Sequence, residues 1–223
     1  MARQIIDLSV LVDESTKSPP STDLKVELRH YNRGPGFWQS SAVSQGLHTG
    51  SHVDSTLHCF PDGETTAEMS LDRVIGSALV VDCTDDGPSQ PVTVAHLERY
   101  ADRIREGDII LLRTGWTDRM WGRFPQFFTE SPYLDLEAAR WLADRPIKAI
   151  GFDFFEEYCA RLPNFTSDDF VVHITLLSNK IVLLEGVTNL GALPGERVEF
   201  FAPFYKIAGS EGAGARFFAI IEE

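Results

Sequence analysis

The sequence has few cysteines, few basic residues and no long apolar run. Its three cysteines, Cys59, Cys83 and Cys159, are odd in number and form no CxxC pair, which is typical of a protein in a reducing compartment. No apolar stretch approaches the length of a membrane span, and no cleavage-type segment follows the short apolar run near the N-terminus. We therefore expect a cytoplasmic protein without a membrane partner.

The shortage of basic residues makes the chain strongly acidic. Lys and Arg total 20 against 33 Asp and Glu, so the formal net charge is -13 at pH 7. A surface of this sign repels phosphate backbones and anionic lipids, which argues against nucleic acid as a partner. With 223 residues, 43% of them hydrophobic, the chain can build a substantial core, and we expect one domain spanning 1–223.

Strand-like apolar runs alternate with helical patterns in the middle of the chain. Thr93 and Asp135 are candidate N-caps of the first two helices. Buried strands are predicted at 77–84, 108–116, 148–154 and 180–186, and helices at 94–105, 136–144 and 169–179. Strand-like runs near both termini favour additional antiparallel sheet. The predicted fold class is therefore mixed α/β, with extra antiparallel strands.

Three of the six histidines and one aspartate fall within eleven residues: His48, His52, Asp54 and His58. A zinc-protease helix would need a glutamate directly after the first histidine, and this chain has Thr49 there, followed by a helix-breaking glycine. An extended stretch is more consistent with the pattern. It would put His52 and Asp54 on one face, where a nitrogen and an oxygen ligand reach a common point.

A single histidine is more often a surface or hydrogen-bonded core residue than a ligand, but four clustered groups favour a metal or catalytic site. Three local ligands rarely complete such a site, so we expect a contribution from further along the chain. His173 lies on the apolar face of its predicted helix, and Glu185 ends an apolar strand twelve residues later. A charged residue at the end of a strand can simply reach solvent. Because His173 points inward nearby, we instead interpret Glu185 as a metal ligand.

These residues resemble the signature of a known family. The run "HTGSHVDSTLH" (48–58) is similar to the HxGTHxDxPxH motif of the putative cyclase family, which includes bacterial kynurenine formamidases and isatin hydrolases. Three further blocks are similar to that family in the same order: "GDIILLRTGW" (107–116), "HITLLSNKIVLLEGVTNL" (173–190) and "FYKIAGSEGAGARFFAI" (204–220). Together the blocks cover most of the chain from about residue 45 to the end.

The resemblance implies a swivelling β/β/α fold, a homodimer or homotetramer, and metal-dependent hydrolysis of an amide or similar acyl bond. Position by position, His48, His52 and Asp54 match the ligands of one divalent ion. Asp54, His173 and Glu185 match those of a second, with Asp54 bridging, and His58 matches the proton donor and acceptor. This mixed ligand set suits zinc, manganese or iron, and we expect zinc or manganese, one or two ions per chain.

The chain departs from the family pattern mainly where the family contacts substrate. In the first motif Ser51 and Thr56 replace a threonine and a proline, and "GFDFFEEYC" (151–159) departs from a GxDxxSxD run, so we expect a rebuilt substrate wall. In the family's formamidases, a tryptophan near the N-terminus stacks on the substrate. The corresponding segment here, 18–24, has no aromatic residue, so only Phe37 or Trp38, from another part of the chain, could take that role. These differences predict a hydrolase with its own small substrate, an aromatic or cyclic amide, imide or ester.

Three alternatives stay open. The chain could be a kynurenine formamidase itself, a metal-dependent cyclase or lyase whose ion stabilises an enolate, or a non-catalytic binding protein. The last alternative predicts the loss of a ligand or of His58, and none is lost. Four phenylalanines near the motifs favour a flat apolar substrate, although core packing would explain some of them equally well: Phe37, Phe60, Phe154 and Phe155.

Overall fold

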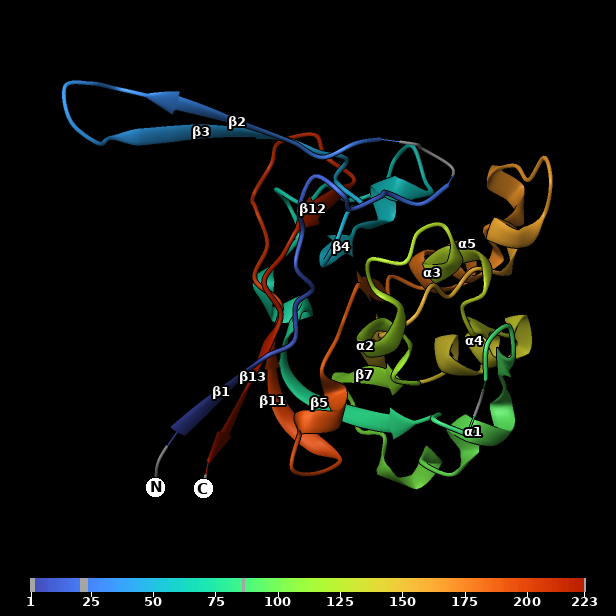
Figure 1. The fold of residues 1–223 in the computed structure, drawn as a ribbon. Helices are drawn as coiled ribbons and strands as arrows, with labels where there is room; N and C mark the ends of the chain where they lie inside the picture. Colours follow the sequence, from blue (N-terminus) through green and yellow to red (C-terminus); the bar gives the residue numbers. More distant parts are fainter. Residues whose placement is uncertain (1–2, 21–23, 86, 223) are drawn as a thin grey trace.

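The computed structural model describes residues 3–20, 24–85 and 87–222 (Figure 1). Its largest element is a nine-stranded sheet in the order β1-β13-β11-β5-β7-β9-β10-β4-β12. The four central parallel strands are β5 (Ile75–Asp82), β7 (Asp108–Arg113), β9 (Ile147–Phe152) and β10 (Val182–Glu185). The antiparallel strands at the two sides are β1 (Arg3–Asp7), β13 (Phe218–Glu222), β11 (Arg197–Phe201), β4 (His52–Asp54) and β12 (Gly212–Gly214). The predicted mixed α/β fold with extra antiparallel strands is confirmed.

The helices gather on one side of the parallel strands (Figure 1). They are α1 (Val94–Glu98), α2 (Trp116–Met120), α3 (Gln126–Thr129), α4 (Leu136–Ala143) and α5 (Val171–Ser178). Alternate residues of each buried strand face opposite sides. In β7, Ile110 and Leu112 pack into the core cluster under the helices, whereas Ile109 and Leu111 pack into a second cluster on the other side of the sheet. The strand pattern read from the sequence therefore reflects burial on both faces.

Short elements connect the main ones. Two small sheets are formed by β2 (Glu27–Asn32) with β3 (Gln39–Ser44), and by β6 (Pro91–Val92) with β8 (Tyr133–Leu134). The 3-10 turns are η1 (Thr56–His58), η2 (Leu71–Arg73), η3 (Ala101–Arg103), η4 (Tyr158–Arg161), η5 (Ser167–Asp169) and η6 (Leu190–Ala192). The β2–β3 hairpin extends away from the rest of the molecule, and every residue of both strands is exposed (Figure 1). Among the described residues, no helix is both long and apolar enough to cross a membrane.

Two predicted helices are shorter than their sequence patterns. The helix expected at 94–105 ends at Glu98, because Tyr100 turns away to accept a hydrogen bond from the backbone of Asp82 at the end of β5. The helix expected at 169–179 begins at Val171. Its first residues instead form a separate 3-10 turn, in which the Asp169 carboxylate accepts hydrogen bonds from the backbone and hydroxyl of Thr166. Tertiary and capping contacts override helix propensity in both places.

Candidate metal centre

Three of the predicted ligands lie on two neighbouring strands. In the antiparallel pairing of β4 with β10, Glu185 is opposite His52, so both side chains and Asp54 share one face of the sheet. The neighbouring pair, Val53 of β4 and Leu184 of β10, points to the opposite side of the sheet and packs into the second core cluster. The extended geometry predicted for His52 and Asp54 is confirmed, and both side chains are buried.

His48 reaches the same point from the preceding loop. Gly50 has φ +75°, a left-handed conformation that other residues adopt only with strain. The loop also packs against Gly186, where an added Cβ would lie 2.5 Å from the Gly50 carbonyl oxygen. This tight turn brings Nδ1 of His48 to 2.7 Å from Oδ1 of Asp54, as expected for a loop that folds back at a glycine.

His173 comes from α5 and completes the cluster. Its Nε2 lies 3.0 Å from Oε1 of Glu185 and 3.7 Å from Oδ2 of Asp54. Asp54 is the central residue, because its other oxygen faces His48 at 2.7 Å and Nε2 of His52 at 3.4 Å. The structure therefore brings all five predicted ligands together, with Asp54 between two groups of donors.

The donor atoms fit a divalent cation. Nδ1 of His52 donates to the carbonyl oxygen of Gly50 at 2.9 Å, which leaves a lone pair on Nε2. That Nε2 and Oδ2 of Asp54 are buried and have no hydrogen-bond partner among the described residues. Two ligands of one zinc ion can lie no more than about 4.6 Å apart, given metal–ligand bonds of about 2.0 to 2.3 Å. The distances of 2.7 to 3.7 Å within the cluster meet this limit.

The charges of the cluster shift its pKa values. Burial alone would raise the pKa of Asp54, but the imidazoles of His48 and His52 outweigh it and hold that pKa well below its usual range. Burial would lower the pKa of His48, yet the Asp54 carboxylate raises it to about 9. In the metal-free protein at neutral pH, His48 is therefore a protonated partner of Asp54.

His58 lies beside this group at the end of η1. Its ring stacks on His48 with a centroid distance of 4.0 Å and lies 5.5 Å from the ring of His173. Burial lowers the pKa of His58 to about 4, although the nearby Asp54 carboxylate acts in the opposite direction. The imidazole is thus neutral at pH 7 and can accept a proton. Its donor atom also lies within 4.8 Å of donor atoms of His48 and Asp54, so the geometry is compatible with a ligand role as well.

Three acidic residues near the ligands were not identified from the sequence. Oε1 of Glu211 lies 3.2 Å from Nε2 of His48, and Oε1 of Glu157 lies 2.9 Å from Nδ1 of His173. Glu156 is fully buried next to them, with Oε1 3.4 Å from the same His173 nitrogen. The available signal was the adjacent pair in "FFEEY", which follows two phenylalanines shortly after a buried strand, because glutamates in such apolar surroundings are seldom buried without partners.

An aromatic wall lies against the cluster. A narrow cavity touches His48, His52 and Glu185, and its aromatic lining consists of Trp121, Phe127, Phe128, Phe154 and Phe155. Two of these rings, Phe154 and Phe155, lie in the segment 151–159, where we predict a rebuilt substrate wall. The other candidates lie elsewhere: Phe60 packs against the core under the helices, while Phe37 and Trp38 are 90% and 65% exposed near the tip of the hairpin.

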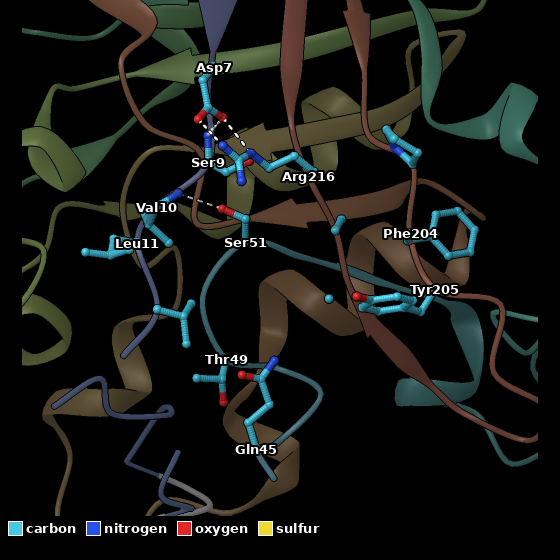
Figure 2. A pocket seen from close by; sticks show the side chains of 14 residues that line it. Asp7, Ser9, Val10, Leu11, Gln45, Thr49, Ser51, Phe204, Tyr205 and Arg216 are labelled. Carbon is cyan, nitrogen blue, oxygen red and sulfur yellow. Dashed lines mark hydrogen bonds and ion pairs between the residues drawn. The ribbon is translucent and has the colours of Figure 1, made fainter. Parts of the chain in front are cut away.

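A larger cavity, of about 680 Å³, lies beside the loop that carries His48 (Figure 2). Thr49 and Ser51 line it, whereas the histidines on either side of them belong to the metal cluster. Ser51 accepts a hydrogen bond from the backbone of Val10 at 2.9 Å, and Arg216 pairs with Asp7 across one end. None of the five candidate ligands lines this cavity.

Comparisons with known proteins agree with the fold and with the family that the sequence motifs resemble. The chain matches the family described as "Putative cyclase" over residues 6–156. It is 31% identical to a kynurenine formamidase of Erythrobacter litoralis over 81% of this chain and 76% of that protein, and 29% identical to one of Salinibacter ruber over 95% of each. Among solved structures, isatin hydrolase A of Labrenzia aggregata, bound to benzyl benzoate, superimposes with a TM-score of 0.84 at 23% identity, covering 99% of this chain and 94% of that chain.

Proposed function

This chain belongs to the putative cyclase family, and from that premise we propose that it is a metal-dependent hydrolase that cleaves a carbon–nitrogen bond of a small amide. The observation that carries the proposal is the position of Asp54, buried between His48 and His52 on one side and His173 and Glu185 on the other. A buried carboxylate with an unpaired oxygen is costly unless a cation compensates it.

The residues divide into two roles. As the family motif implies, His48, His52 and Asp54 would hold one divalent ion, and Asp54, His173 and Glu185 would hold a second. Donor atoms within 4.8 Å of one another also group His52 and Asp54 with Glu185, and His48 and Asp54 with His58. When bound, such an ion polarises a substrate carbonyl and activates water near neutral pH. His58 is neutral at pH 7 and faces the same space, so it would accept a proton and deliver it to the leaving nitrogen. Zinc and manganese both suit this set of nitrogen and oxygen donors.

The aromatic wall supports a flat substrate. Five aromatic residues line the narrow cavity of about 20 Å³ beside the ligands, and four of them belong to the core under the helices. Aromatic walls favour planar, apolar molecules, and a substrate of this kind would contact these rings only if the cavity widens. We propose an aryl formamide or an aromatic cyclic amide or imide as the substrate class. Identities of 31% and 29% to kynurenine formamidases make hydrolysis of N-formylkynurenine a specific candidate. The exposed positions of Phe37 and Trp38 leave open which aromatic residue would stack on that substrate.

Metal analysis and a substrate screen test the proposal together. We expect chelation to abolish hydrolysis of aryl formamides or aromatic cyclic amides, and zinc or manganese to restore it. Acid titration that detects the release of a carboxylate product distinguishes hydrolysis from a lyase or cyclase reaction at the same site. Full activity of the metal-free protein would contradict metal dependence. Faster turnover of an aliphatic amide than of an aromatic one of similar size would contradict the substrate class.

A further inference from the structure

Glu156 is a buried carboxylate that accepts no hydrogen bond from the described residues, although its Oε1 lies 3.4 Å from Nδ1 of His173. Its side chain is 0% exposed, and neither Oε1 nor Oε2 has a hydrogen-bond partner in the part of the chain that the structure describes. No lysine or arginine among the described residues forms an ion pair with it. A buried group of this kind costs several kcal/mol unless a cation or a proton neutralises it. Burial raises the pKa of Glu156 well above its usual value, so its charge has to be compensated by a proton, by His173 or by a bound cation.

The surroundings of Glu156 point to a cation. One donor atom each of Glu156, His173 and Glu185 lies within 4.8 Å of the other two, and all three residues are buried. Glu157 pairs with Nδ1 of His173, which leaves Nε2, 3.0 Å from Glu185, as the nitrogen that would bind an ion after losing its proton. Three such donors, two of them carboxylates, are a ligand set for a divalent ion.

The number of buried carboxylates agrees with two ions rather than one. Asp54, Glu156, Glu157 and Glu185 carry four negative charges when ionised, and none of them is more than 7% exposed. A single divalent ion would leave two of these charges uncompensated if the histidines are neutral ligands. Two divalent ions would compensate all four. The family motif accounts for only two of the carboxylates, Asp54 and Glu185.

We propose that Glu156 is a further metal ligand, which joins His173 and Glu185 to hold a second divalent ion in each chain. The inference rests on the proposed function in that the first ion occupies the site of His48, His52 and Asp54. It adds a ligand at a position where the family pattern has a serine. The other source of compensation is a proton on Glu156, and it predicts that the number of bound ions does not depend on this residue.

Zinc titration of four purified proteins distinguishes a metal ion bound by Glu156 from a proton on Glu156. The proteins are wild type, Glu156→Gln, Glu156→Asp and, as a matched control, Glu130→Gln at an exposed position. After removal of metal by chelation, zinc per chain is measured by mass spectrometry, and affinity is measured by competition with a chromophoric chelator. We expect two zinc ions for wild type and the control. We expect one for Glu156→Gln, or a second ion bound about 10- to 100-fold more weakly, and a smaller loss for Glu156→Asp.

Melting temperatures provide an independent readout. Without metal, Glu156→Gln should melt no lower than wild type, because the substitution removes an uncompensated charge. With zinc, wild type should gain more stability than the variant, since it binds one more ion in the folded state.

Unchanged zinc number and affinity in Glu156→Gln would overturn this inference alone. If wild type binds no zinc or manganese, the proposed function falls together with it. If Glu156→Gln does not fold, Glu156→Asp keeps the charge, and wild-type affinity for both ions in that variant would then overturn the inference.

Discussion

Oε1 of Glu157 lies 2.9 Å from both the backbone nitrogen and the ring Nδ1 of His173. The backbone nitrogen donates to this carboxylate and Nδ1 pairs with it, so Nε2 is the ring nitrogen left to bind an ion once its proton is displaced. That atom faces Glu185 and Asp54. A carboxylate behind a ligating histidine fixes its tautomer and orientation and raises its basicity. Glu157 is therefore a positioning residue behind the candidate metal centre.

Removal of this carboxylate should weaken metal binding without breaking the fold of the site. We expect Glu157→Ala to lower zinc affinity about 10- to 100-fold, the usual effect of losing an outer-shell partner. Glu157→Gln keeps an oxygen acceptor for His173 and should lose less. Chelator competition measures both values, and equal zinc affinity in Glu157→Ala and wild type would show that Glu157 does not position the ligand.

His58 and His52 should respond differently to substitution. His58→Ala should keep nearly all bound metal while turnover falls by about 10² to 10⁴, the usual contribution of general acid–base catalysis. His52→Ala should lose metal together with activity, because its Nε2 is a buried donor of the cluster. Metal content and kinetics of the two purified proteins decide between the roles. A folded but metal-free His58→Ala protein would place His58 in the coordination shell.

Metal binding should release protons at pH 7. Burial would lower the pKa of His48, but the Asp54 carboxylate outweighs it and raises that pKa to about 9 in the metal-free protein. A histidine must be neutral to bind an ion, so zinc displaces this proton, and affinity should increase as the pH rises from 6 to 9. Calorimetry in two buffers of different ionisation enthalpy counts the protons. His30→Ala, on the exposed hairpin, is the control, and pH-independent affinity would contradict the assignment.

Arg197 should matter for stability well away from the metal centre. Its guanidinium donates two hydrogen bonds, of 2.7 and 3.1 Å, to the buried carboxylate of Asp108 and thereby joins β11 to β7. Arg197→Ala would leave Asp108 buried without its partner and should cost about 2 to 4 kcal/mol of unfolding free energy. The matched control is Arg140→Ala, which breaks only an exposed pair with Glu137 and should cost less than about 1 kcal/mol. Urea unfolding of the three proteins at pH 7 tests the difference.

The β2–β3 hairpin makes the expected homo-oligomer testable. An isolated two-stranded hairpin is at best marginally stable in water, and all residues of these two strands are exposed. Residues 25–44 carry three basic side chains and one acidic one, a net charge of +2, whereas the rest of the chain carries -15. We propose that the hairpin binds the acidic surface of a second copy of this chain, with Phe37 and Trp38 in the contact.

Light scattering coupled to size exclusion measures this assembly. We expect wild type to be a dimer or tetramer, and Phe37→Ser combined with Trp38→Ser to weaken self-association by at least about tenfold, or about 1.4 kcal/mol. Arg29→Glu combined with Arg33→Glu should do the same through charge. A wild-type monomer, or an oligomer insensitive to both double variants, would exclude the hairpin as the contact.

The ligands of the candidate centre were predictable because their chemistry is local. His52 and Asp54 are two residues apart, and an extended strand fixes their common face without any knowledge of the rest of the fold. Glu156 and Glu157 were recognised only as a departure from a motif. Both contact His173 of α5, a long-range contact that no local pattern reports. The β2–β3 hairpin was not predicted because its strands carry no apolar face of their own. The helix predicted at 94–105 was too long because the Tyr100 side chain binds the end of β5.

The pairing of β4 with β10 makes bound metal a reporter of strand register. His52 and Asp54 face the same side as Glu185 only when Glu185 is opposite His52. A slip of one residue would send the β4 side chains to the opposite face and would bring Val53 to the metal side. Metal content in any variant of this sheet therefore measures whether two strands, more than a hundred residues apart in sequence, are correctly aligned.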